Sequence, residues 1–178
     1  DLSTSDKLFN ENIIINEDFK FKFPLPTFNN TWQDIFYSES NNLKNFKYDG
    51  LNNVLFKSKK LSKFKINNYI LFNKDILILT DEKGNIIIFS INQNKVLKKF
   101  NFYKKKYKKV KKLLNIISEN NIIYVSDNIG YLYAYDYLED KILWAQYYKI
   151  PFRSNLKVTK HKIITSDQNN KLIFESPF

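Results

Sequence analysis

The chain has 178 residues, the length of one domain with a sizeable hydrophobic core. Lys and Arg number 29 against 18 Asp and Glu, which gives a net charge of +11. Such a charge can indicate a polyanion partner. Because Lys, Asn, Ile, Phe and Tyr are abundant while Gly, Ala and Arg are scarce, an AT-rich coding background is the favoured cause. The absence of Cys excludes disulfides, a thiolate metal site and a cysteine nucleophile, and no apolar run approaches the length of a membrane span.

Residues 1–53 are predicted to be an extended and largely irregular segment. Pro24-Leu25-Pro26 favours an extended backbone, and the aromatic residues between Trp32 and Tyr48 lack a clean period. We expect these aromatics to pack on a sheet domain that occupies residues 54–178. At its start, residues 54–57 predict a short strand that would close a ring by pairing with a final blade.

Apolar runs separated by turn residues predict blades of four antiparallel strands. The first blade spans residues 64–102, with strands at about 68–72, 75–80, 85–91 and 95–102. The second blade spans residues 111–148, and residues 155–174 supply three strands of a third.

One turn recurs at the same place in each unit. It places Asp at its second position and Gly or Asn at its fifth, in the pairs Asp81 and Gly84, Asp127 and Gly130, and Asp167 and Asn170. An Asp carboxylate can accept bonds from backbone N–H groups at a turn, and Gly and Asn tolerate a positive φ, so all six residues are predicted to be structural. The copies are 46 and 40 positions apart.

A period of this length, with several strands per copy, is typical of a β-propeller. We therefore predict an all-β fold of four-stranded antiparallel blades. Because about three blades are present and closed propellers usually have four to eight, the propeller is expected to be partial or open.

Between the first two blades, seven Lys occupy the nine positions from Lys104 to Lys112. Tyr103, Tyr107 and Val110 are spaced as on one helical face. A basic patch with interleaved aromatics suits nucleic acid or anionic lipid head groups. The favoured interpretation is a solvated connection between blades, because neither a second patch nor Arg or Gly supports binding.

No catalytic residue, metal site or cofactor is predicted, and the chain is expected not to be an enzyme. His161 is the single histidine and lies in a predicted turn. Without Cys or a second His, no ordinary transition-metal cluster or histidine-based triad is available, and no glycine-rich phosphate loop is present.

The segment Ile150-Pro151-Phe152-Arg153-Ser154 follows the last strand of the second blade. Pro151 limits sheet pairing, so the segment is predicted to be a loop at a blade junction. Loops on a rigid scaffold commonly carry binding, and an exposed aromatic beside an Arg is a favoured interface anchor. The alternative is that Arg153 forms a local structural ion pair.

The segment Ile122–Trp144 resembles the quinoprotein-type (PQQ-like) propeller repeat, with Ala134, Asp136 and Trp144 at the positions of the recurring Ala-x-Asp strand and late Trp. Pro24-Leu25-Pro26, Trp32, Val54 and Ile150–Asn155 extend the resemblance over about residues 24–174 to the alphaproteobacterial form of the BamB family. Lys98 replaces the Trp of the first blade, Asn94 and Asp140 stand where Gly is usual, and the lipid-bearing Cys of that family is not in this chain.

The resemblance implies the N-terminal part of an eight-bladed ring. It also implies a non-enzymatic scaffold of the outer-membrane β-barrel assembly machinery, at the periplasmic face of the outer membrane. The implied partners are the periplasmic (POTRA) domains of BamA and the assembly complex. Membrane attachment would come only through a lipid anchor outside this chain.

In BamB proteins the resembling loop, an apolar residue followed by Arg, contacts BamA. That role carries over to Phe152 and Arg153, with Ile150 as a further candidate. Two alternatives stay open: a fragment of a PQQ-dependent quinoprotein dehydrogenase, and a basic module that binds nucleic acid through Lys104–Lys112. Under the favoured interpretation neither a cofactor nor nucleic acid is expected.

Overall fold

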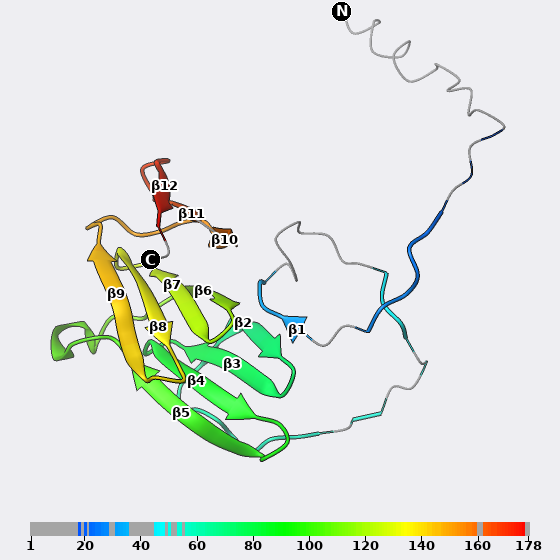
Figure 1. Cartoon of the computed structure of the whole chain (residues 1–178). Helices are drawn as coiled ribbons and strands as arrows, with labels where there is room; N and C mark the ends of the chain where they lie inside the picture. Colours follow the sequence, from blue (N-terminus) through cyan, green and yellow to red (C-terminus); the bar gives the residue numbers. More distant parts are fainter. Residues whose placement is uncertain are drawn as a thin grey trace, which may run out of the picture.

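The structure is a computed structural model that describes residues 18, 20, 22–28, 31–35, 45–48, 50, 53–54, 56–159 and 162–176. These residues form three antiparallel sheets that follow one another along the chain (Figure 1). The strands are β1 (Thr31–Trp32), β2 (Ile66–Asn73), β3 (Ile76–Asp81), β4 (Asn85–Ser90), β5 (Lys95–Asn101), β6 (Leu114–Glu119), β7 (Ile122–Asp127), β8 (Tyr131–Asp136), β9 (Lys141–Tyr147), β10 (Lys157–Thr159), β11 (Lys162–Ser166) and β12 (Leu172–Glu175). Within the described ranges, no helix has the length and apolar character to cross a membrane.

Each sheet is a simple up-and-down meander. The first blade runs β2-β3-β4-β5 with β1 added beside β2, the second runs β6-β7-β8-β9, and the third has β10-β11-β12. Every pairing is antiparallel, and the sheets do not close into a ring. The predicted all-β, partial propeller is therefore confirmed.

The first two blades repeat each other in detail. The turns after their first strands carry a positive φ at Lys74 and Asn120, and those before their last strands at Asn94 and Asp140. Both last strands also bulge at the same place. In the first blade Ile88 pairs with Lys98 and Phe89 with Val96, and in the second Ala134 pairs with Trp144 and Tyr135 with Ile142. Asn and Asp stand where Gly is usual because they also tolerate this backbone conformation.

The strands that begin the three blades lie next to one another. β2 contacts β6, and β6 contacts β10, which is how successive blades of a propeller meet at its axis. Side chains that alternate along the strands fill the two spaces between the sheets. Thus Tyr133 and Tyr135 face the first blade, whereas Leu132 and Ala134 face the third. All four are fully buried, so β8 is apolar on both faces.

Part of the N-terminal segment, which was predicted to be largely irregular over residues 1–53, joins the blades. Residues 31–35 cross the first strands of all three sheets. β1 pairs with β2, the N–H of Ser118 in β6 donates to the carbonyl of Gln33 (2.9 Å), and the ammonium of Lys157 in β10 forms an ion pair with Asp34. This short segment ties the three blades together on one side.

The strand expected at residues 54–57 does not appear among the residues described there. Val54, Phe56 and Lys57 have no strand pairing. Phe56 instead packs on the outer face of the first blade, with its ring centroid 5.8 Å from that of Phe89. The strand was predicted to pair with a final blade, and the three sheets of this chain do not include such a partner. Of the described residues there, Phe56 packs on the first blade, whereas Val54 is 86% exposed.

Ala134→Lys is expected to destabilise the chain by roughly 3–5 kcal/mol, because it buries an unpaired charge between the second and third blades and overpacks a filled space. Ala145→Lys is the matched control. Ala145 lies on the neighbouring strand, is exposed, and pairs with Tyr133, so its substitution should change stability by less than about 0.5 kcal/mol. Urea denaturation of both variants measures the difference, and equal stabilities would contradict burial of β8 on both faces.

Candidate functional site

The predicted partner-binding loop joins the second blade to the third and is held from both sides. The N–H of Phe152 donates to the carbonyl of Asp127 (3.0 Å), and the N–H of Arg153 donates to that of Ser166 (2.9 Å). The N–H of Gln168 closes the arrangement by donating to the carbonyl of Pro151 (2.9 Å). Backbone hydrogen bonds to two different blades therefore hold this loop in place.

Phe152 differs from the expectation of an exposed aromatic anchor. Its side chain is only 5% exposed and packs in the core between the second and third blades, where its ring meets Tyr148 edge-on. A phenylalanine at the junction gains more from the apolar space between two sheets than from water. Phe152 thus anchors the loop from beneath, and Ile150 beside it is half-buried.

Arg153, in contrast to Phe152, is exposed. Across the described part of the chain, none of the ion pairs includes its guanidinium. The alternative interpretation of Arg153 as half of a local ion pair therefore receives no support from these residues.

The three repeated aspartates hold three equivalent turns. In each, Oδ1 accepts the backbone N–H groups two and four residues later: Lys83 and Asn85 for Asp81, Ile129 and Tyr131 for Asp127, and Asn169 and Lys171 for Asp167. All three carboxylates are buried. Their bonds satisfy backbone groups that would otherwise lose water, which gives them a structural task.

The glycines of these turns lie beneath the connections between blades. A Cβ on Gly130 would come within 2.8 Å of the Ile150 carbonyl oxygen, and one on Gly84 within 2.4 Å of the Tyr103 ring. Both residues also have a positive φ. The connection after each blade therefore crosses closely over the turn of that blade, and this position requires a residue without a side chain.

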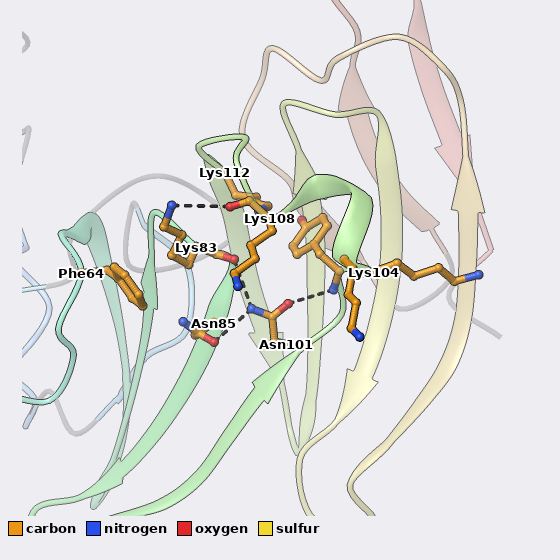
Figure 2. Close-up of a pocket in the computed structure, with 9 residues that line it drawn as sticks. Phe64, Lys83, Asn85, Asn101, Lys104, Lys108 and Lys112 are labelled. Atoms are coloured by element: carbon orange, nitrogen blue, oxygen red, sulfur yellow. Dashed lines mark hydrogen bonds between the residues drawn. The ribbon is translucent and has the colours of Figure 1, made fainter.

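A basic pocket of about 500 Å³ lies at the first of these crossings (Figure 2). Its walls come from the first blade and from the connection that carries the lysine run. The lining residues are Phe64, Lys83, Asn85, Asn101, Tyr103, Lys104, Lys105, Lys108 and Lys112. These nine residues form the lysine pocket.

The lysine pocket concentrates positive charge without a lining carboxylate. Lys112 is 2% exposed, and its ammonium lies 5.2 Å from the centroid of the Tyr103 ring and donates to the Tyr107 carbonyl. Burial, together with the charge of Lys83, holds the pKa of Lys112 below its ordinary value, and Asp81 and Asp127 partly offset this shift. Both carboxylates accept hydrogen bonds from their own turns and from Ser62 and Tyr103, and neither lines the pocket.

Sequence reasoning found the lysine run but not its partners. Lys83 and Phe64 belong to the first blade, some 20 residues or more before the run, and Lys83 is held by a contact to the Lys108 carbonyl (3.5 Å). The connection itself contains one 3-10 turn, Lys105–Tyr107. The position of Lys83 inside the repeated Asp-to-Gly turn was the available signal, because that turn faces the following connection.

The described residues do not bring metal-ligating side chains together as a metal centre. Across the described ranges, no three His, Cys, Asp or Glu side chains gather as a metal site would require. His161 lies outside the described residues.

Comparisons with known proteins bear on the fold. No protein-family model and no curated protein matches this chain. Among solved structures, the quinohemoprotein alcohol dehydrogenase from Comamonas testosteroni matches with a TM-score of 0.60 at 12% identity, over 78% of this chain and 23% of that chain. BamB from Moraxella catarrhalis matches with a TM-score of 0.46 at 16% identity, over 57% of this chain and 29% of that chain.

The fold of this chain is thus similar to that of part of this dehydrogenase, and its blades are those of a β-propeller. The chain spans between about a quarter and a third of the length of the first structures it matches. At such identities the likeness concerns the fold and leaves the activity to be argued from the site.

Gly130→Ala is expected to cost roughly 2–4 kcal/mol, because the new Cβ would meet backbone atoms of Ile150 that cannot move freely and φ is +102°. Gly50→Ala provides the control. Gly50 has a φ of +74° but open space around it, so only backbone strain of about 1 kcal/mol is expected there. Thermal and urea denaturation report both values, and equal losses would show that the close approach of the connection is unimportant.

Stability is expected to fall at alkaline pH. Burial is the main reason that the pKa of Tyr103 lies far above its usual range, and electrostatic interactions with Tyr133 and Asp127 raise it further. Burial also raises the pKa of Tyr133. A pKa that is higher in the folded than in the unfolded chain gives stability that is complete below the unfolded value of about 10 and is lost as the pH rises towards the folded value.

Urea denaturation at about pH 8 and about pH 11 tests this linkage. Tyr103→Phe should lose less stability between the two pH values than the parent chain, because one buried hydroxyl no longer resists ionisation. Tyr69→Phe, at an exposed tyrosine of β2, should lose as much as the parent. An unchanged pH dependence in Tyr103→Phe would contradict the assignment.

Proposed function

We propose that this chain is part of a non-enzymatic propeller scaffold, and that it binds a protein partner through the loop at Arg153. The proposed partner is the set of periplasmic domains of BamA, in the β-barrel assembly machinery at the periplasmic face of the outer membrane. The partner and the location come from the sequence resemblance to the BamB family. The physical support comes from the loop itself.

Arg153 carries the proposal. It is the single arginine of a chain whose other 28 Lys and Arg residues are all lysine. In such a background a lysine would supply positive charge equally well at a solvated position. Arginine differs by its planar fork of donors, which binds a carboxylate or backbone carbonyls in two-point geometry. We therefore attribute the arginine at this exposed loop position to recognition of a partner group.

The loop is also organised in advance. Phe152 is buried beneath it, and its backbone bonds reach both the second and the third blade. A loop already held in one conformation loses little entropy on binding. In this arrangement Arg153 contacts the partner, Ile150 contributes its exposed part, and Phe152 acts by holding the loop.

Substitution of Arg153 separates its charge from its geometry. Arg153→Glu is expected to abolish binding to the purified periplasmic domains of BamA, and Arg153→Lys to weaken it by at least about tenfold, since lysine retains the charge but loses the fork. Titration by calorimetry measures the affinities. Lys95→Glu, an exposed charge reversal on β5, is the matched control and should bind like the parent chain.

Thermal melts accompany these titrations. Both Arg153 variants should melt with the parent chain, because the side chain is exposed and no ion pair holds it among the described residues. Parent-like affinity in a folded Arg153→Glu chain would remove this loop from the interface. Parent-like affinity in Arg153→Lys alone would reduce the role of Arg153 to charge.

A further inference from the structure

We propose that the lysine pocket is a binding site for an anion that carries two or more phosphate groups. This proposal is independent of BamA binding, because the pocket lies at the connection between the first and second blades and Arg153 lies at the next one. The class of ligand follows from the charge, shape and donors of the pocket.

Two separate chain segments bring the charges together. Lys83 lies in the turn between β3 and β4, whereas Lys104, Lys105, Lys108 and Lys112 belong to the connection after β5. A solvated connection has no reason to place its lysines against a lysine of the preceding blade, because like charges repel at short range. The arrangement stores a repulsion that a bound anion would relieve.

In the described part of the chain, the lysines that line the pocket form no ion pair. Across the described residues, the ion pairs involve Lys98, Lys111 and Lys157, none of which lines the pocket. Glu82, which precedes Lys83 in the chain, forms an ion pair with Lys111 (3.6 Å) outside the pocket lining. Ammonium groups in the pocket thus keep donors available for an anion.

Two further features suit a phosphate-bearing ligand. The amide of Asn101 donates to Asn85 Oδ1 (3.0 Å) and to the Lys83 carbonyl (3.1 Å), so it fixes the floor of the pocket. Figure 2 shows Lys108 extending from the connection towards these two amides. Phe64, which is 41% exposed, forms an apolar wall beneath the Lys83 ammonium, with 5.6 Å from Nζ to the ring centroid.

The size and charge of the pocket set the number of phosphate groups. Each phosphate monoester group carries about two negative charges near neutral pH, so five lysines exceed what one such group can balance. A pocket of about 500 Å³ likewise exceeds a single phosphate and accommodates a ligand of several groups. Lysine is a usual ligand of phosphate, to which it offers a compact point charge.

Isothermal titration calorimetry with inorganic tripolyphosphate tests the proposal on the whole chain. Saturable one-to-one binding is expected at about 150 mM salt, where diffuse surface attraction is largely screened. The variant K104Q/K108Q should weaken this binding by at least roughly tenfold, because it removes two charge-assisted contacts. Both lysines are exposed, so the fold should be unaffected.

The matched control is K95Q/K99Q, which removes two exposed lysines from β5 outside the pocket. It should change the affinity by less than about twofold, the effect of a lower overall charge at this ionic strength. Equal weakening in the two variants would overturn the proposal, because it would reduce binding to net charge. Absence of saturable binding to both tripolyphosphate and the vesicles described below would also overturn it.

A second arm identifies the source of the phosphate groups. Co-sedimentation with phosphatidylcholine vesicles that contain one quarter phosphatidylglycerol tests clustered lipid head groups. Vesicle binding that K104Q/K108Q loses and tripolyphosphate displaces supports the pocket and assigns it to head groups, whereas tripolyphosphate binding alone assigns it to a free anion. If the chain binds a single-stranded oligonucleotide but neither tripolyphosphate nor the vesicles, the proposed site is wrong and an extended nucleic-acid surface is favoured instead.

Discussion

A buried carboxylate that accepts backbone N–H groups is the interaction on which this structure depends. In every blade it fixes the turn between the second and third strands, and thereby the register of the two central strands. The same turn then receives the connection to the next blade, which crosses directly over Gly84 in the first blade and over Gly130 in the second. The spacing between successive sheets follows from this contact.

A second carboxylate fixes the opposite end of each of the first two blades. It comes from a different position of the repeat in each blade. In the first blade Asp75 accepts from the Ser90 hydroxyl and the Asn92 N–H, both at 2.6 Å. In the second, Asn121 occupies the place of Asp75 and donates to Asp136, which occupies the place of Ser90 (2.6 Å). The carboxylate thus lies before β3 in the first blade and at the end of β8 in the second, and in both blades it holds the turn. What is retained is an acceptor near free backbone N–H groups, which either strand can provide.

Both candidate sites lie where a connection crosses a turn. Such a position combines a backbone fixed from below with side chains that face solvent, as loops on a rigid scaffold generally do. At the first crossing it presents a group of lysines, and at the second it presents Arg153. Half-buried Tyr103 and buried Phe152 hold the two connections in place and leave the charged residues accessible to a ligand.

The sequence by itself determined the blades, because period, turn chemistry and strand pattern are local properties of the chain. The recurring Asp, with Gly or Asn three residues later, located three turns, and strand alternation puts Tyr133 and Ala134 of β8 on opposite faces of their sheet. Only the tertiary structure decided which residues are exposed at a junction and which meet across it. Phe152 is buried because two sheets enclose it, and Lys83 joins the lysine run because a turn of one blade contacts the connection to the next. Contacts between segments far apart in the chain leave no period in the sequence, which is why the burial of Phe152 and the place of Lys83 beside the lysine run were not predicted.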